Sequence, residues 1–223
     1  MHMLIPLKDT MHSISSALLF PTIIILLLFL ALVVIEFGSL LVEIITERRR
    51  ARADIPGIID SFQGSEVGKI QDCINSSNLF KRHKLALEEL SDHTHLPAAS
   101  QQAIARRLLT GEELHYAGIT NRTDLVARLG PMFGLMATLI PLGHGLIALG
   151  QGDTKTLADS LLTAFDATVA GLAAAGVAFA ISRLRKRWYE EYLSSLETLM
   201  EGLLEVTARE RGIEEKYQAQ VNA

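Results

Sequence analysis

The sequence predicts an all-α membrane protein with three transmembrane helices and long cytoplasmic helical extensions. Three observations lead to this fold class: the apolar residues gather in three blocks, each block is nearly free of charge, and the charged residues lie between and after the blocks. At about 1.5 Å rise per residue, each block is long enough to cross a hydrocarbon core about 30 Å thick. A lipid bilayer is therefore the expected environment.

The remaining composition excludes several classes of function. The chain has 223 residues and a net charge of −4, and its basic residues sit at membrane edges, so we expect no nucleic-acid partner. Cys73 is the only cysteine, so neither a disulfide nor a cysteine-based zinc site can form within one chain. No phosphate-binding loop and no nucleophile–base set is present. We expect neither an enzyme nor a cofactor.

The first apolar block predicts transmembrane helix 1 over residues 16–40, after a short external N-terminal segment at 1–15. Residues 11–35 contain no Asp, Glu, Lys or Arg, a run longer than the apolar core of a signal peptide. Pro21 falls in the first turns of this helix, where a missing N–H costs least. Four arginines lie between Arg48 and Arg52, just past the span, and mark the cytoplasmic side.

Residues 41–128 form the largest polar region, which we interpret as a cytoplasmic helical loop. Apolar residues recur there every three to four positions, which favours helices over strands. The expected helices are Ile55–Phe62, Glu66–Asn75, Leu79–Leu90 and Ala98–Ile119. His93 and His95 lie two residues apart beside Asp92, and we weigh a metal site there against a solvated loop, which we favour.

The second and third blocks predict a transmembrane hairpin. Helix 2 covers 129–152 and contains no charged residue, an external turn covers 153–159, and helix 3 covers 160–182 with Asp166 as its one charge. Small residues permit close approach of membrane helices, so Gly130, Gly134 and Gly171 are expected to mediate helix packing.

The last segment, 183–223, is expected to be a cytoplasmic C-terminal helix and tail. Basic residues flank the hairpin at Arg122 and Arg128 and again from Arg183 to Arg187, whereas the other membrane face shows only Lys8 and Lys155. This asymmetry predicts an external N-terminus and a cytoplasmic C-terminus. Trp188, Tyr189 and Tyr192 are expected to be interfacial aromatics, followed by an amphipathic helix that ends near Gly212.

Polar side chains inside the hairpin are candidates for an ion pathway. A charge such as Asp166 near the bilayer centre costs on the order of 2.5–3.5 kcal/mol, so it must be protonated, paired or in contact with water. Thr163 lies one turn before it on nearly the same face, whereas Thr168 is about 200° around the helix. For His144, near the outer end of its span, we favour a packed neutral ring over a proton relay.

Two motifs in the hairpin resemble those of the MotA/TolQ/ExbB proton-channel family. Leu129-Gly-Pro-Met-Phe-Gly-Leu-Met-Ala-Thr138 is similar to the second-span motif, approximately (V/I)-(A/G)-P-x-x-G-L-x-G-T. Ala167-Thr168-Val-Ala-Gly171-Leu-Ala-Ala is similar to the third-span motif, approximately (T/A)-T-A-x-G-L-x-x-A. The spacing and the three-span plan look like the TolQ/ExbB branch.

This resemblance implies a ring-forming subunit, pentameric in well-studied members, in the inner (cytoplasmic) membrane. The second and third spans would line a central pore occupied by single-span partners of the ExbD/TolR/MotB type, which carry an intramembrane Asp. The family's threonine positions correspond to Thr138 and Thr168. The implied function is a stator in which proton-motive force drives ion flow and mechanical work.

The chain departs from the family pattern at one position. TolQ and ExbB carry a Glu five residues before the third-span Thr, where this chain has Thr163, with an acid at Asp166 instead. Either Asp166 replaces that Glu or the ion path differs, so Thr163 and Asp166 join Thr138 and Thr168 as pathway candidates. The departure also motivates an alternative, a membrane scaffold of the same fold that no longer conducts ions. An intramembrane hydrolase is the least favoured reading.

Overall fold

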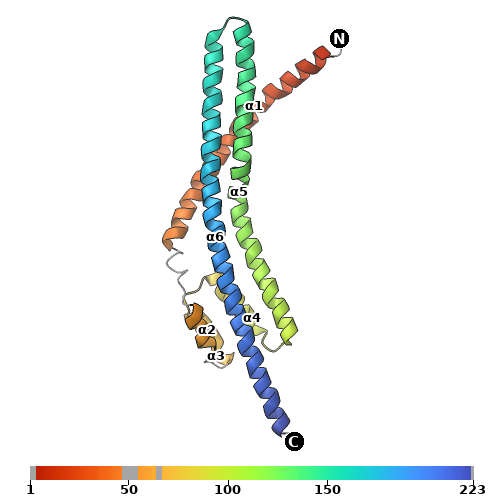
Figure 1. The fold of residues 1–223 in the computed structure, drawn as a ribbon, viewed down its shortest axis with the longest axis vertical. Coiled ribbons are helices and arrows are strands. Elements are labelled where there is room, and N and C mark those ends of the chain that lie inside the picture. The colour runs from red at the N-terminus through yellow and green to blue at the C-terminus, as the bar shows by residue number, and fades with distance from the viewer. Residues whose placement is uncertain (1–3, 47–54, 64–66, 222–223) are drawn as a thin grey trace. The chain divides into compact units, whose positions relative to one another are not determined.

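The computed structural model describes residues 4–46, 55–63 and 67–221, and every regular element in these ranges is an α-helix (Figure 1). Within these ranges the helices are α1 (Leu4–Thr46), α2 (Ile55–Gln63), α3 (Val67–Ser76), α4 (Lys81–Asp92), α5 (Ala98–Gly150) and α6 (Thr154–Val221). The chain divides into two compact units. We call Met1–Leu41 with Ile119–Arg185 the span unit, and Val42–Gly118 with Lys186–Ala223 the extension unit.

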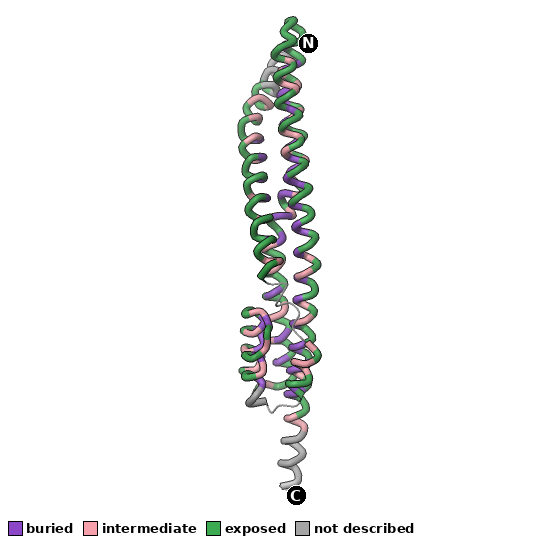
Figure 2. Tube along the Cα trace, turned by 90° about the vertical axis from the view of Figure 1, so that its left-hand side faces the viewer, coloured by how far each residue is buried: buried purple, intermediate pink, exposed green. Residues whose placement is uncertain are grey.

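The span unit is built from α1, α5 and α6, the three described helices that are long and apolar enough to cross a membrane. Their contact is a small apolar cluster to which each helix contributes: Phe29 and Val33, Val126, and Ala174 and Ala178. Phe29 meets Phe133 edge to face, with ring centroids 5.8 Å apart. Most other large apolar side chains of the unit are exposed, as expected for helices surrounded by lipid. Figure 2 colours the chain by burial, with exposed residues in green.

Three glycines, Gly130, Gly134 and Gly171, lie at a close contact between α5 and α6. A Cβ added at Gly171 would come within 2.9 Å of the Gly130 carbonyl oxygen and 3.0 Å of the Gly134 Cα. Backbone atoms cannot move aside as a flexible side chain can, so larger residues would force the helices apart. The helix packing expected of these glycines thus has a geometric basis in their lack of a side chain.

The turn between α5 and α6 is shorter than the predicted 153–159, because α6 already begins at Thr154. Gly152 adopts a positive φ of 81°, a conformation that glycine reaches without steric cost. The Asp153 carboxylate then accepts hydrogen bonds from the backbone N–H of Thr156, at 3.0 Å, and from its hydroxyl, at 2.5 Å. This cap starts the helix earlier than composition alone suggests.

Other helix ends also lie further out than predicted. Helix α1 begins at Leu4, inside the expected N-terminal segment, and α5 continues without interruption from Ala98 through the second span. The polar stretch near residue 120 does not break α5, since the Thr123 hydroxyl bonds back to the Thr120 carbonyl at 2.9 Å. Helix α6 passes Gly212, because a single glycine costs only about 1 kcal/mol in a helix.

The extension unit has its own apolar core. Residues of α2, α3, α4, α5 and α6 form it, among them Phe62, Ile70, Leu87 and Leu196, all fully buried. The helices expected between 55 and 119 are therefore present and packed together. The basic run 47–52 lies outside the described residues.

Two aromatic residues expected at the membrane interface are instead part of this unit's interior. Tyr189 and Tyr192 are only 6% and 8% exposed. Tyr189 stacks on Tyr116 with ring centroids 4.4 Å apart, and Tyr192 packs against Phe80 at 4.7 Å. The prediction was wrong for these two because helix–helix contacts in the extension unit bury them.

Candidate functional site

Thr138 and Thr168 come from the two packed helices of the hairpin. A Cβ built at Gly134 would lie 3.8 Å from the Thr168 Cα, so Thr168 is level with Gly134 on the opposing helix. Thr138 follows Gly134 by one helical turn, about 6 Å along α5. Both side chains are half-buried at the edge of the α5–α6 contact.

Both threonines point away from α1. Helix α1 contacts α5 through Met136, whose sulfur accepts a hydrogen bond from the Thr22 hydroxyl at 3.3 Å. Thr138 is two residues further, about 200° around α5. On α6, Thr168 lies about 120° from Ala174, which packs in the cluster with α1. The two hydroxyls therefore lie together on a side of the hairpin that faces away from α1.

Asp166 does not share that face. It precedes Thr168 by two residues, about 200° around α6, and its side chain is exposed. Thr163, one turn before Asp166, is also exposed, and its hydroxyl donates to the Asp159 carbonyl at 3.0 Å. The four candidates thus form two pairs, Thr138 with Thr168 and Thr163 with Asp166, on different sides of the hairpin.

The hydroxyl groups of Thr138 and Thr168 each donate a hydrogen bond to a backbone carbonyl of their own helix. Thr138 donates to the Leu135 carbonyl at 2.6 Å, and Thr168 donates to the Ala164 carbonyl at 3.1 Å. Each hydroxyl oxygen keeps lone pairs that accept a hydrogen bond. The pair can therefore bind a proton-bearing group, such as a neutral carboxylic acid, without contributing a fixed charge.

A buried ion pair, which the sequence analysis missed, joins α1 to α6. Arg185 is 1% exposed, and its guanidinium donates to Glu36 at 2.5 Å and to the Ser39 hydroxyl at 3.0 Å. Sequence position alone groups Arg185 with the membrane-edge cations. Its spacing could have revealed its burial, because it continues the buried α6 face of Ala178 and Ile181 at helical intervals.

Two further polar contacts connect the spans. The Ser182 hydroxyl donates to the Asp124 carboxylate, joining α6 to α5. His144 bonds through Nδ1 to the Ile140 carbonyl at 3.0 Å and through Nε2 to the Ser16 hydroxyl at 3.1 Å. Because a carbonyl only accepts, Nδ1 carries a proton, and in that neutral tautomer Nε2 accepts from the Ser16 hydroxyl. This pairing satisfies a neutral imidazole packed between α1 and α5.

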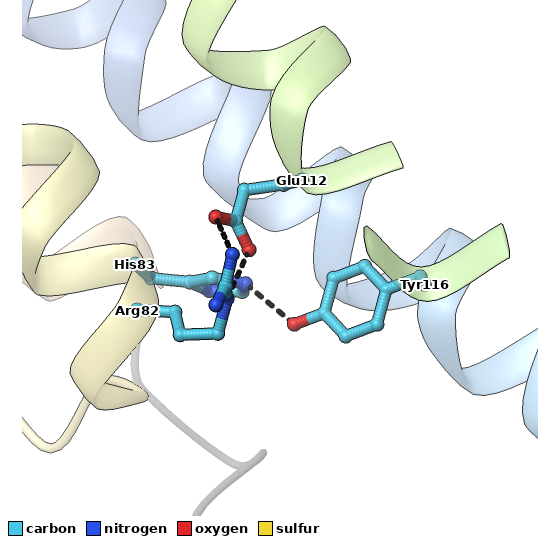
Figure 3. Close-up of polar contacts among 4 residues, drawn as sticks. All are labelled: Arg82, His83, Glu112 and Tyr116. Carbon is cyan, nitrogen blue, oxygen red and sulfur yellow. Dashed lines mark hydrogen bonds and ion pairs between the residues drawn. The ribbon is translucent and has the colours of Figure 1, made fainter. Parts of the chain in front are cut away.

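In the extension unit, α4 and α5 are joined by a polar cluster (Figure 3). Arg82 makes two parallel hydrogen bonds to Glu112, at 2.8 and 2.9 Å, and this pairing raises the pKa of Arg82. His83 Nε2 lies 3.2 Å from the Tyr116 hydroxyl, and burial lowers the pKa of His83 below its usual value. The cluster is a structural bridge between helices.

The histidines considered for metal binding do not converge with further ligands. His93 and His95 stack with centroids 6.2 Å apart, and His93 Nδ1 donates to the Glu89 carbonyl at 2.7 Å. Within the described part of the chain, no group of three or more His, Cys, Asp or Glu residues is placed to hold a metal ion.

Comparison with known proteins identifies the family. The model of the MotA/TolQ/ExbB proton channel family matches residues 76–198, which is more than half of the chain and includes both spans of the hairpin. No curated protein sequence matches the chain. With three helices able to cross a membrane, the chain is a multi-pass membrane protein, and it belongs to the MotA/TolQ/ExbB proton channel family.

Proposed function

We propose that this chain is the ring-forming subunit of an ion-driven motor of the TolQ/ExbB type, in the cytoplasmic membrane, with an external N-terminus and a cytoplasmic C-terminus. Several copies, five by analogy with the family, surround an axial channel. A single-span ExbD/TolR-like partner occupies the channel and carries an intramembrane Asp. The membrane potential supplies about 2.3 kcal/mol per charge per 100 mV, so the work requires no covalent chemistry in this chain.

The observation that carries the proposal is the shared face of Thr138 and Thr168. Helix α1 covers the other side of the hairpin, so the threonine face is the one left for the axis of a ring. Hydroxyl oxygens there accept a hydrogen bond from a neutral partner carboxyl, and they hold no permanent charge that would trap an ion. The proton channel activity of the family agrees with this chemistry.

Asp166 has a separate role in this account. Because it points about 200° away from Thr168, it lies toward a neighbouring subunit or toward a second water-accessible path. A charge in lipid would be costly at this depth, so assembly is expected to cover Asp166 or hydrate it.

Proton flux into proteoliposomes that contain the chain and its co-purifying partner tests the proposal. We expect Thr138→Val and Thr168→Val to abolish gradient-driven flux while the ring still assembles, because valine keeps the shape and removes the hydroxyl. Thr198→Val is the matched control. It makes the same change on an exposed α6 threonine that also bonds one turn back, at 2.8 Å, but lies in the extension unit.

Wild-type flux in both span variants would remove the threonines from the ion pathway. The position of Asp166 off the threonine face favours one second candidate, a scaffold that keeps the fold without conducting. Absence of gradient-dependent flux in the wild-type protein, in Asp166→Asn and in Thr168→Val would support the scaffold instead.

A further inference from the structure

A groove runs between α5 and α6 in the extension unit. It has two adjoining hollows, of about 240 and 290 Å³, which share Gln102, Glu201 and Leu204. Apolar residues form its floor: Ala105, Leu109, Met200 and Leu204. Such a surface on the outside of a helical unit is suited to receive another helix.

The rim of the groove is acidic. Glu197, Glu201 and Glu205 follow one another at intervals of four residues along α6, and all three are exposed. On the α5 side the lining contains two glutamines and one cation, Arg106. The three carboxylates outnumber this cation, so the groove favours an occupant that carries positive charge.

A complementary surface lies on the opposite face of α5. Arg107 is two residues past Ala105, about 200° around the helix from the groove floor. The residues on the same face of α5 as Arg107 are exposed, and none of them is acidic. We call this face the α5 patch, formed by Ala103, Arg107, Thr110, Gly111, Leu114 and Gly118. Leu114 is 69% exposed, and a Cβ at Gly111 or Gly118 would meet nothing within 4 Å.

We propose that the groove of one chain receives the α5 patch of a second copy, so that the extension units join head to tail around the ring. The inference rests on the proposed ring. Surfaces on opposite faces of one helix make a heterologous contact, and such contacts form a ring when the rotation between neighbouring copies closes. In a ring about the membrane normal, equivalent residues lie at equal heights. Arg107 of the neighbour is then level with Glu197 and Glu201, which line the groove beside Leu109.

Disulfide cross-linking in native membranes tests the contact. In a Cys73→Ser background, the pair Thr110→Cys and Glu197→Cys should give a ladder of oligomers on oxidation, and neither single variant should. The matched control pairs Thr110→Cys with Thr198→Cys, because Thr198 is adjacent to Glu197 but about 100° away around α6. We expect several-fold less ladder from the control pair.

Charge reversal provides a second measurement that does not depend on introduced thiols. Arg107→Glu should lower the yield of intact rings several-fold, and adding Glu201→Arg should restore it. Failure of Glu201→Arg to rescue the assembly, or equal ladders from both cysteine pairs, would overturn the proposed contact. A cross-link from Glu197→Cys to a different protein would also overturn it, because the groove would then belong to another partner.

These outcomes are distinguishable from failure of the proposed function. A strong ladder from a protein without proton flux would keep the contact and reject the channel. Proton flux with no ladder above the control would keep the channel and reject the contact.

Discussion

Replacing Gly171 with alanine tests the close approach of α5 and α6. The new Cβ would lie 2.9 Å from the Gly130 carbonyl oxygen and 3.0 Å from the Gly134 Cα, both backbone atoms. Overpacking of this kind typically costs about 1–3 kcal/mol, because the helices must separate or distort. Alanine also gains helix propensity over glycine, by about 1 kcal/mol in water.

Gly176→Ala separates the two effects. It makes the same change one and a half turns along α6, where an added Cβ meets nothing within 4 Å. The propensity gain is common to both variants, so the difference between their thermal midpoints in detergent isolates the contact. We expect Gly171→Ala to unfold several degrees lower, at about 2–4 °C per kcal/mol for a chain of this length. Equal midpoints for the two variants would refute the close approach.

The remaining predictions concern the buried polar groups. Arg185→Met should destabilise the span unit by about 3–5 kcal/mol, because it leaves Glu36 without its partner. Adding Glu36→Gln should recover part of this loss when unfolding is measured in detergent. A double mutant no more stable than Arg185→Met would argue against the pair. Burial lowers the pKa of His83 in the folded protein, so on acidification His83 is protonated in the unfolded chain before it is protonated in the folded one. The free energy of unfolding should therefore fall as the pH drops below about 6.5, and it should level off below the pKa of His83 in the folded state. His83→Gln should flatten that pH dependence, while the exposed His115→Gln should not; parallel curves for the wild type and His83→Gln would contradict the assignment.

The spans and the family were predictable because their signals are local. Long uncharged runs identify membrane helices without tertiary information, and the motifs ending at Thr138 and beginning near Thr168 are contiguous in the chain. Glycine spacing favours a close α5–α6 contact for a similar reason: backbone approach depends on the absence of a side chain at particular turns.

The sequence was less informative where contacts between distant parts of the chain determine the surroundings of a side chain. Tyr189 and Tyr192 follow a basic cluster and looked interfacial, but their rings pack on Tyr116 and Phe80 from distant parts of the chain. Sequence position groups Arg185 with the membrane-edge cations but does not reveal its ion pair, because its partner Glu36 lies on another helix, 149 residues away in the chain. Sequence spacing placed Asp166 and Thr168 on different faces, but only the contacts of α1 show which of those faces remains uncovered.

The central claim is that Thr138 and Thr168 line a water-accessible axial channel. Thiol accessibility tests it most directly: in a Cys73→Ser background, Thr138→Cys and Thr168→Cys are reacted with a membrane-impermeant thiol reagent in the assembled protein without its partner. Val34→Cys, at a 66% exposed position on α1, is the lipid-facing control. The account predicts rapid labelling of both hairpin cysteines and none of the control. Unreactive hairpin cysteines in an intact ring would contradict it.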